Sequence, residues 1–592
     1  MGRTGKRAAP AWADSIPTTS ETAVAHRVRK RWLLPTPPGC APALAAELGV
    51  PLAIACLLAR RGLTDPASAR GFLQPELTAL HAPTALLDMD RALERLQRAI
   101  RDGEKIRIHG DYDVDGITST VILKTAIEMA GGKVGFTIPH RLKEGYGIQP
   151  AAVDLCAEDG VTLIISVDTG IRAAEVVRRA RALNIDAIIT DHHLPEAELP
   201  DAVAVINPNR PGCSYPNKDL CGVGVAYKLV EALLSPLGWE PARLRRILGS
   251  FLKLVAIGTV ADVVPLTGEN RIIVSHGLAG LRDVRNPGLR ALFEVAKLEP
   301  GCAPTARQIG FRVAPRINAA GRMASASDAV ELFLTQDPAR AHQIATQLHE
   351  LNTARQAEEA AIVEAILEEC ARQPIGDAHF ALVFCAENWH RGVLGIVASR
   401  LVDRFHRPAF VLGEQDGVAQ GSGRSIAGFH LLDALDALPG MFVKYGGHSH
   451  AAGLTMRAGA VGDFRDRFNA RARSILKPED LRASLAIDAI VSLGELDDRL
   501  FQDLQMLEPF GAQNPEPLFA ALDVEVAGPL TLMKEKHVRV PLRQGGRTVF
   551  FKGFHFAERA EELRQGARID VAFTLEEDRY RGGWSAVMKD IR

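Results

Sequence analysis

The stretch His109-Gly-Asp111-Tyr-Asp113-Val-Asp115-Gly116 decides how this chain folds and where its chemistry lies. It follows residues 105–109, which predict a short β-strand, and it precedes residues 117–129, which have the apolar spacing of a helix. Alternate side chains of an extended backbone share one face, so the three carboxylates would crowd together and repel one another. A bound cation is the natural way to neutralise them.

Two other interpretations compete with a metal site at this stretch. An EF-hand loop also begins DxDxDG, but its twelfth position needs a bidentate glutamate, and counting from Asp111 gives Ile122. The predicted strand before the motif also argues against an EF-hand, which lies between two helices. A solvated acidic loop that caps the helix beginning near Ile117 stays open on this motif alone.

The segments around the acidic motif alternate between strand and helix patterns. Outward from residues 105–109, the predicted elements are a helix at 91–100, a helix at 117–129, a strand at 163–167, a helix at 173–183 and a strand at 187–190. Strands that alternate with helices are typical of a parallel, doubly wound sheet. The fold class predicted for this part of the chain is therefore α/β.

Three further polar groups follow apolar runs that predict strands. They are Asp168 in Ser-Val-Asp-Thr-Gly, the run Asp191-His192-His193, and Asp262 in Gly-Thr-Val-Ala-Asp. The crevice at the carboxyl ends of parallel strands is where sites form in such sheets. Each group has a simpler explanation: a turn at Asp168, a helix cap at Asp191, a structural His pair. Their convergence on one edge instead predicts a Mn²⁺ or Mg²⁺ site, and mixed His and Asp ligands favour Mn²⁺.

The rest of the chain predicts two α/β lobes joined by a long helix, followed by a C-terminal β-barrel. The pattern of the long helix fits a surface helix of one domain equally well. For residues 1–31 the pattern favours a disordered tail, and a functional basic arm is the alternative. The predicted divisions are a disordered polar tail at 1–31, short helices at 32–88, a first α/β lobe at 89–336, the long helix at 337–375, a second α/β lobe at 376–475 and a β-barrel at 476–592.

Composition excludes several classes of protein. The 592 residues are 47% hydrophobic and 24% charged, which is ordinary for a globular protein and unlike a disordered or collagen-like chain. Lys and Arg number 70 against 71 for Asp and Glu, so the chain is not a globally basic nucleic-acid coat, although a local basic groove is compatible with this balance. Apolar runs are too short for a membrane span, and residues 1–31 lack a signal peptide's apolar stretch. We expect a cytoplasmic monomer with reduced cysteines.

At this point the motifs carry a resemblance to a known family. HGDYDVDG, SVDTG, DHH and GTVADVVPL resemble the four signature motifs of the DHH phosphoesterase superfamily. PRINAAGR, WHRGVLGIVASRL, GSGRS and GGHSHAAG resemble its DHHA1 half and the connector. LEPFGAQNPEPLF, residues 507–519, is similar to the segment that opens the oligonucleotide-binding domain of the RecJ single-strand-specific exonucleases. The resemblance runs from about Trp32 to the C-terminus, with the motifs in order.

The resemblance implies a two-metal centre that hydrolyses phosphodiesters with Mn²⁺ or Mg²⁺. It assigns one metal to His109, Asp113 and a bridging Asp168, and the other to Asp115, Asp168, His192 and Asp262. His193 would contact the scissile phosphate or its water, and Asp111 would either bind a metal or act behind the ligands. All these positions hold the expected residue, unlike the family's inactive replication relatives.

The resemblance also implies a lobe that binds the substrate strand. Its candidate phosphate contacts are Arg316, Arg322, Ser422, Arg424 and His448, with Ser422 and Arg424 expected to take the 5′ end. Arginine gives a bidentate fork to phosphate, although each of these arginines would, on position alone, fit a surface salt bridge equally well. Gly222-Val-Gly224 lacks the third glycine of a dinucleotide fingerprint, and we assign it no cofactor.

The predicted barrel interleaves basic residues with aromatic ones, as single-strand-binding surfaces do. We expect Phe551 and Phe573 in the core, and Tyr580 and Trp584, beside an Arg-Gly-Gly turn, exposed for base stacking. We also expect the barrel to be separable, so that deleting residues 507–592 weakens binding of long strands but leaves the metal chemistry intact.

These expectations favour a metal-dependent 5′→3′ exonuclease acting on single-stranded DNA in recombination and repair. The resemblance suggests a single-strand-binding protein and a helicase as partners. Two alternatives stay open: a DHH–DHHA1 phosphodiesterase for short RNA or cyclic dinucleotides, and a non-catalytic DNA-binding scaffold. Residues 507–592, which short-substrate phosphodiesterases usually lack, argue against the first alternative. The presence of every expected metal-ligand residue argues against the second.

Overall fold

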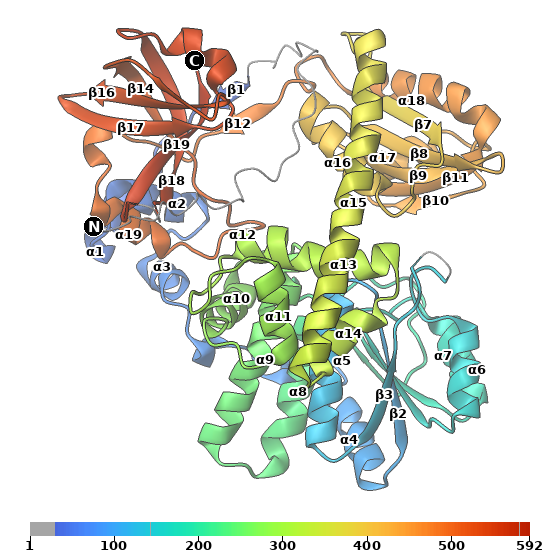
Figure 1. The fold of residues 1–592 in the computed structure, drawn as a ribbon. Coiled ribbons are helices and arrows are strands. Elements are labelled where there is room, and N and C mark those ends of the chain that lie inside the picture. Colours follow the sequence, from blue (N-terminus) through green and yellow to red (C-terminus); the bar gives the residue numbers. More distant parts are fainter. Residues whose placement is uncertain (1–29, 142–143, 579–580) are drawn as a thin grey trace, which may run out of the picture. The chain divides into compact units, whose positions relative to one another are not determined.

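The computed structural model describes residues 30–141, 144–578 and 581–592. The chain forms two compact units, which are described separately (Figure 1). The larger unit contains residues 32–351 and 486–592, and the smaller unit contains residues 352–485. Residues 1–29 of the predicted tail at 1–31 lie outside the described residues.

A parallel sheet with the strand order β3-β2-β4-β5-β6 forms the centre of the larger unit. Its strands are β2 (Lys105–Gly110), β3 (Lys133–Thr137), β4 (Leu163–Val167), β5 (Asp186–Thr190) and β6 (Ala204–Ile206). From β2 the chain first adds β3 on one side, and then β4, β5 and β6 on the other. The order therefore reverses between β2 and β4, which is where doubly wound sheets form their binding crevice.

Helices cover both faces of this sheet. They are α4 (Met89–Arg101), α5 (Val114–Met129), α6 (Pro150–Glu158), α7 (Ala174–Ala182) and α8 (Gly222–Leu234). Ile106, Ile108 and Ile165 point to the face that α4, α5 and α8 cover, whereas Ile164 and Ala187 point to the face of α6 and α7. This alternation buries the strands on both sides, as the apolar runs in the sequence require. Figure 1 shows α6 and α7 on the side of the sheet opposite α5.

A helical layer follows the sheet in the sequence and packs on α5. It contains α9 (Pro241–Ala261), α10 (Gly268–Gly280), α11 (Pro287–Val295), α12 (Ala306–Gln308), the π-helical turn η5 (Ile309–Val313), α13 (Ala314–Met323) and α14 (Ser327–Leu334). Its core joins side chains from α5, such as Ile117 and Val121, to Ile257, Ile309 and Ile317. The last residue of α9 is followed directly by Asp262, which caps that helix.

The C-terminal part of the larger unit is a β-barrel in the order β13-β14-β18-β19-β17-β16-β15, with β14 also pairing β16. Its elements are β13 (Ala489–Ile490), α19 (Asp498–Gln505), β14 (Phe519–Val526), β15 (Thr531–Met533), β16 (His537–Gln544), β17 (Arg547–Gly553), β18 (Arg568–Glu577) and β19 (Trp584–Ile591). The predicted core positions are confirmed, since Phe551 and Phe573 are fully buried.

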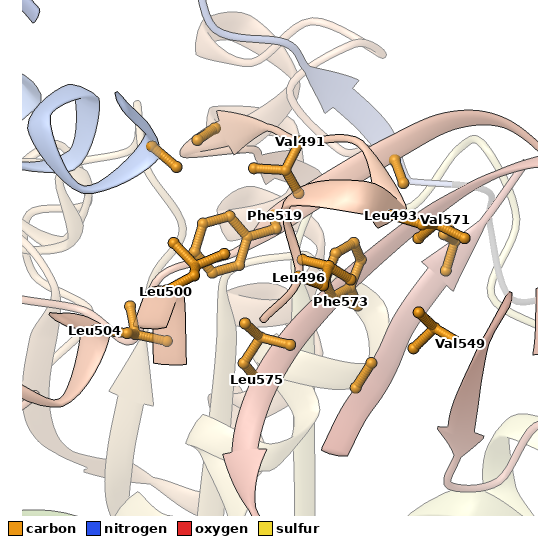
Figure 2. Close-up of a cluster of buried hydrophobic side chains, with 14 of the residues drawn as sticks. Val491, Leu493, Leu496, Leu500, Leu504, Phe519, Val549, Val571, Phe573 and Leu575 are labelled. Carbon is orange, nitrogen blue, oxygen red and sulfur yellow. The ribbon is translucent and has the colours of Figure 1, made fainter. Parts of the chain in front are cut away.

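The barrel shares its hydrophobic core with the N-terminal helices. These helices are α1 (Ala41–Leu48), α2 (Leu52–Arg60) and α3 (Pro66–Leu73). Ile54, Leu57 and Leu58 of α2 belong to the same buried cluster as Phe519 and Phe573, and Figure 2 shows those two rings among the aliphatic side chains of the barrel side of this cluster. Burying one such aliphatic side chain is worth about 1.5–3 kcal/mol. The expectation that the barrel is a separable module therefore fails, because its removal would expose α2.

The smaller unit is built on a mixed sheet in the order β10-β11-β9-β8-β7. Its elements are β7 (Leu382–Glu387), α16 (Leu394–Phe405), β8 (Ala409–Gln415), β9 (Val418–Arg424), α17 (Leu431–Asp436), β10 (Lys444–Gly447), β11 (Ala451–Arg457) and α18 (Val461–Ile475). The predicted long helix is confirmed as α15 (Pro338–Arg372), and the chain passes from the larger to the smaller unit within it.

Among the helices that the structure describes, none is by itself long and apolar enough to span a membrane. Together α1 and α2 meet that criterion by length and composition, but with a bend of 117° between them. All eight cysteines lie in the described part of the chain and carry free thiols, as expected.

Candidate metal centre

Four segments of the larger unit bring acidic and imidazole side chains to the crevice between β2 and β4. The acidic motif connects β2 to α5, Asp168 follows β4, and the run that begins at Asp191 follows β5. Asp262 arrives differently from the prediction, because the apolar run before it is the end of α9 and not a strand. A short buried apolar run has no periodicity that separates a strand from a helix, which explains the error.

The side chains from these segments converge closely enough to hold metal ions. Their ligand atoms form three groups, each within 4.8 Å: Asp111, Asp113 and Asp168; Asp115, His192 and Asp262; and Asp168, His192 and His193. His192 Nε2 lies 3.2 Å from Asp168 Oδ1, 3.7 Å from Asp262 Oδ2 and 3.9 Å from Asp115 Oδ2. His192 and Asp168 are therefore shared between groups.

Helix N-termini and close backbone packing fix the carboxylates. Asp113 caps α5 by accepting hydrogen bonds from the backbone N–H groups of Asp115 and Gly116. Asp115 accepts the N–H groups of Gly222 at 2.6 Å and Val223 at 2.7 Å, at the start of α8. A Cβ atom on Gly222 would lie 2.6 Å from the Cβ of Asp168. Sequence reasoning found no role for Gly222, since its signal is a close approach that appears only in three dimensions.

Burial and mutual repulsion disfavour the ionised state of these carboxylates. Burial, with the charge of Asp113, raises the pKa of Asp111 to about 8 and that of Asp115 to about 7. Burial, with the charge of Asp115, raises the pKa of Asp262 to about 9 and also raises that of Asp168. Burial lowers the pKa of His192 to about 4, so its imidazole is neutral and able to bind a metal.

Unsatisfied polar atoms show that the residues fit a bound cation. Asp111 Oδ1, Asp168 Oδ1, Asp262 Oδ2 and His192 Nε2 are buried and make no hydrogen bond among the described residues, although His192 Nε2 and Asp168 Oδ1 lie only 3.2 Å apart. Such atoms are rare in folded proteins and call for a missing partner. All four lie in the groups above, and hard carboxylate oxygens with one imidazole suit Mn²⁺ or Mg²⁺.

His193 is held differently from His192. Its Nδ1 lies 2.7 Å from Oδ1 of the fully buried Asp191, which also accepts the backbone N–H groups of Ile171, His192 and His193. Although burial acts against it, the hydrogen bond with Asp191 raises the pKa of His193. The interaction at Nδ1 leaves Nε2 of this half-exposed ring for another partner.

His109 stands apart from the predicted ligand set. Among the described residues it belongs to none of the three groups, and its Nε2 lies 3.6 Å from Cys156 Sγ. Burial, with the charge of Arg107, lowers the pKa of His109 to about 4.

Cationic side chains lie beside the acidic motif. Arg141, which sequence reasoning missed, has its guanidinium carbon 4.8 Å from the centre of the Tyr112 ring. The predicted Arg322 follows Gly321, whose missing side chain lets α13 approach the Tyr112 carbonyl. Arg316 Nη1 donates to the Arg312 carbonyl one turn earlier, and its Nε is buried without a hydrogen-bond partner among the described residues.

Ser422 and Arg424 lie together in the smaller unit. They alternate along β9, which places both side chains on the sheet face that α16 covers. A Cβ atom on Gly395, in the first turn of α16, would lie 3.0 Å from Arg424 Nη2 and 3.5 Å from Ser422 Cβ. A hydroxyl, a guanidinium and a helix N-terminus thus meet at one place, which is a chemistry suited to phosphate. Gly395 was not predicted as part of it.

His448 is exposed in the turn between β10 and β11. Its backbone N–H donates to the Ala451 carbonyl at 2.8 Å, and Ala451 pairs with Arg424 on the neighbouring strand. This register places the predicted His448 turn at the same end of the sheet as Arg424.

Family models match three parts of the chain. The N-terminal domain of the DHH family matches residues 105–259, the DHHA1 domain matches 377–474, and the RecJ OB domain matches 487–589. The chain is 38% identical to the single-stranded-DNA-specific exonuclease RecJ of Escherichia coli over 520 residues, which cover 84% of this chain and 89% of the relative. This chain belongs to the RecJ family of single-stranded-DNA-specific exonucleases. The resemblance of its motifs is thereby confirmed.

Other RecJ proteins agree in sequence and in fold. The RecJ of Bacillus subtilis is also 38% identical, over 531 residues that cover 89% of this chain and 66% of the relative. The crystal structure of Thermus thermophilus RecJ in complex with Mn²⁺ matches with a TM-score of 0.80 and 32% identity, covering 96% of this chain and 80% of that one. The Mg²⁺ complex of the same protein matches with a TM-score of 0.74 and 31% identity, covering 96% of this chain and 78% of that one.

Trp584 of the RecJ OB domain lies differently from expectation. Trp584 is half-buried, packs against the barrel core, and donates from Nε1 to Asp498 Oδ1 at 3.0 Å, while Tyr580 lies outside the described residues. The more exposed ring is Phe550 on the outer face of β17, with the Arg539 guanidinium carbon 4.1 Å from its centre. Because side chains alternate along a strand, the burial that was predicted for Phe551 places the neighbouring Phe550 on the outer face.

Proposed function

We propose that this RecJ-family chain is a metal-dependent exonuclease that degrades single-stranded DNA from its 5′ end in recombination and repair. The observation that carries the proposal is the set of buried, unpartnered ligand atoms at the crevice between β2 and β4. A structural acidic loop would not leave four buried polar atoms without hydrogen bonds, whereas a divalent cation binds oxygen and nitrogen atoms of this kind.

Each side chain of the centre has a proposed task. Asp115, His192 and Asp262 would hold one cation and Asp111, Asp113 and Asp168 the other, with His109 an additional ligand only if its ring reorients. Bound divalent cations would supply Lewis-acid stabilisation of the phosphodiester and a more acidic water. His193, fixed through Nδ1 by Asp191, would present Nε2 to the scissile phosphate or to the attacking water.

The smaller unit would give the enzyme its polarity. A two-metal centre alone has no preference for either end of a strand, so direction requires a site that holds one terminus. We assign the 5′-phosphate to Ser422, Arg424 and the N-terminus of α16. Arg316, Arg322 and His448 would contact the strand's backbone, and residues 580 and 584, together with Phe550, are candidates for stacking on bases.

The remaining proposals concern organisation and setting. We propose the domain divisions given by the sequence, with the catalytic part at residues 89–336 and the substrate-binding part at 376–475. We further propose a cytoplasmic monomer that receives its substrate from a helicase and from single-strand-binding protein, because an enzyme limited to single strands needs unwound DNA.

One assay tests the central proposal. A single-stranded oligonucleotide with a fluorophore at its 3′ end is digested with Mn²⁺ or with EDTA, alongside a duplex and a dinucleotide. We expect Mn²⁺-dependent shortening from the 5′ end, faster with a 5′-phosphate than with a 5′-hydroxyl, and little cleavage of the duplex. Shortening from the 3′ end would refute the polarity, and preferential cleavage of the dinucleotide would favour a short-substrate phosphodiesterase.

A further inference from the structure

A segment at the entrance to the barrel contacts the part of the chain that carries Asp262. We call residues 507–517, Leu-Glu-Pro-Phe-Gly-Ala-Gln-Asn-Pro-Glu-Pro, the strap. The Leu266 N–H donates to the strap carbonyl of Ala512 at 2.9 Å. A Cβ atom on Gly511 would lie 2.6 Å from Cδ1 and 3.0 Å from Cγ of the buried Leu266, so a side chain at residue 511 would press on the branch point of Leu266 as well as on its terminal methyl.

The strap is held in one shape by Asn514, which is fully buried. Its Nδ2 donates to the carbonyls of Leu507 at 2.8 Å and Pro509 at 2.9 Å, and its Oδ1 accepts from Arg61 Nε at 2.8 Å. The backbones of Gly511 and Asn514 also exchange hydrogen bonds in both directions, at 2.8 and 3.1 Å. A loop with these internal bonds presents the Ala512 carbonyl in a fixed position.

Arg271 of α10 joins the beginning of the strap to the helical layer around the metal centre. Its guanidinium is buried and donates to the carbonyls of Leu507, Met506 and Phe72 at 2.7–2.9 Å. Hydrogen bonds from a buried charge are stronger than neutral ones. The strap is therefore attached to α10, which begins directly after the segment that follows Asp262.

The segment between Asp262 and α10 needs such support. Val263 has φ 60°, a left-handed backbone that a β-branched residue rarely adopts, and its side chain is 69% exposed. A strained residue of this kind persists only where its surroundings over-determine it. On one side Asp262 N–H closes the end of α9, and on the other side Leu266 is bonded to Ala512.

We infer that the strap is a positioning element of the metal centre, and that Gly511 and Asn514 act through Leu266 to hold Asp262 beside Asp115 and His192. The inference rests on the proposed function, since it takes Asp262 as a metal ligand. The strap precedes most of the barrel strands in the sequence, but the inference gives it a function in the metal centre. Groups that orient metal ligands typically affect metal affinity by about 10–100-fold.

Gly511→Ala tests the inference, with Gly494→Ala as a matched control. The control adds the same methyl in the same C-terminal part, where the nearest atom is Ser492 Oγ at 3.7 Å. Calorimetry with Mn²⁺ alone should show about a 10-fold loss of affinity in Gly511→Ala and no change in the control. The KM for a short oligonucleotide should stay constant while kcat falls. Leu266→Val, which removes the obstructing Cδ1, should restore Mn²⁺ affinity in the Gly511→Ala background.

Hydrogen exchange in the wild type gives a second measurement that depends on no variant. Added Mn²⁺ should slow exchange of the Leu266 N–H more than that of the Val526 N–H, which bonds to Ala567 in the barrel at 2.8 Å. Equal Mn²⁺ affinity in folded Gly511→Ala and wild type, or no selective protection of Leu266, would overturn the inference. Absence of Mn²⁺ binding by the wild type would instead overturn the proposed function.

Discussion

Gly222→Ala is the substitution whose effect on the metal centre follows most directly from the structure. The new methyl would lie 2.6 Å from the Cβ of Asp168 and 2.7 Å from its Oδ1, well inside van der Waals contact. Asp168 is 2% exposed and belongs to two of the three ligand groups, so it could move away from the methyl only by leaving the position in which it is proposed to bind a cation. Gly222 also donates its N–H to Asp115, so a shift of the backbone instead would disturb a second ligand.

The cost of this clash can be bounded and compared with a control in the same helix. Overpacking a filled interior costs about 1–3 kcal/mol, and displacing a metal ligand should add a loss of Mn²⁺ affinity of about 10–100-fold. In Gly224→Ala the methyl would also lie 2.6 Å from its nearest neighbour, but that neighbour is the terminal Cδ2 of Leu220, whose Cγ is 3.6 Å away, and the three nearest atoms include none from Asp115 or Asp168. Alanine in the interior of α8 should then recover up to about 1 kcal/mol of helix propensity.

Calorimetric titration with Mn²⁺ and thermal unfolding of both variants distinguish these effects. We expect Gly222→Ala to lose Mn²⁺ affinity and hydrolysis of a 3′-labelled single strand, while Gly224→Ala keeps both and has an equal or higher Tm. If folded Gly222→Ala binds Mn²⁺ as tightly as Gly224→Ala does, Asp168 is not held by this contact and its proposed role as a metal ligand fails.

Four further outcomes are expected. Asp168→Ala should abolish Mn²⁺-dependent hydrolysis while a gel-shift assay still detects binding of single-stranded DNA; near-normal turnover would remove Asp168 from the centre. His193→Ala should lower kcat more than Mn²⁺ affinity, and loss of calorimetric Mn²⁺ binding would show that its role is that of a ligand. Arg424→Ala should reduce the preference for 5′-phosphorylated over 5′-hydroxyl strands by about 10-fold or more, as expected for the loss of one charge-assisted hydrogen bond. Gly395→Ala should also reduce this preference, because its methyl would lie 3.0 Å from Arg424 Nη2, and an unchanged ratio in both variants would place the end-binding site elsewhere. Deletion of residues 507–592 should lower the Tm steeply or prevent folding, because α2 loses the barrel side of its core; a stable, cooperatively folded truncation would show that the shared core is dispensable.

The convergence of the acidic and imidazole side chains was largely predictable because parallel strands end at one edge of a sheet. Asp111, Asp168 and His192 follow strands that the apolar runs identify, and that alone predicts their convergence. The convergence of Asp262 was predicted for the wrong reason, since the run before it is helical. Its position depends on α9 packing against α5, a contact between segments more than a hundred residues apart that no local pattern records.

Other features required the three-dimensional structure because their signal is a close approach or a distant partner. The glycines at 222 and 395 are ordinary in sequence, and only the atoms opposite them reveal why a side chain is excluded. Trp584 is an aromatic residue of the kind that stacks on bases. Its Nε1–H nevertheless donates to Asp498, which lies 86 positions earlier in the sequence. A prediction from neighbours in sequence cannot include such a partner.

The strap shows that a segment can belong to one domain by sequence and contact the functional site of another part of the chain. The strap belongs to the oligonucleotide-binding part by sequence similarity, and this supported the expectation of a removable module. Its carbonyls and the barrel's buried rings instead contact Arg271, Leu266 and the N-terminal helix α2. Because Leu266 lies four residues after Asp262, a change at the entrance of the barrel reaches the metal centre through one short strained segment. Measurements on barrel variants should therefore include Mn²⁺ affinity as well as DNA binding, since a fall in activity alone would not distinguish a lost base contact from a displaced ligand.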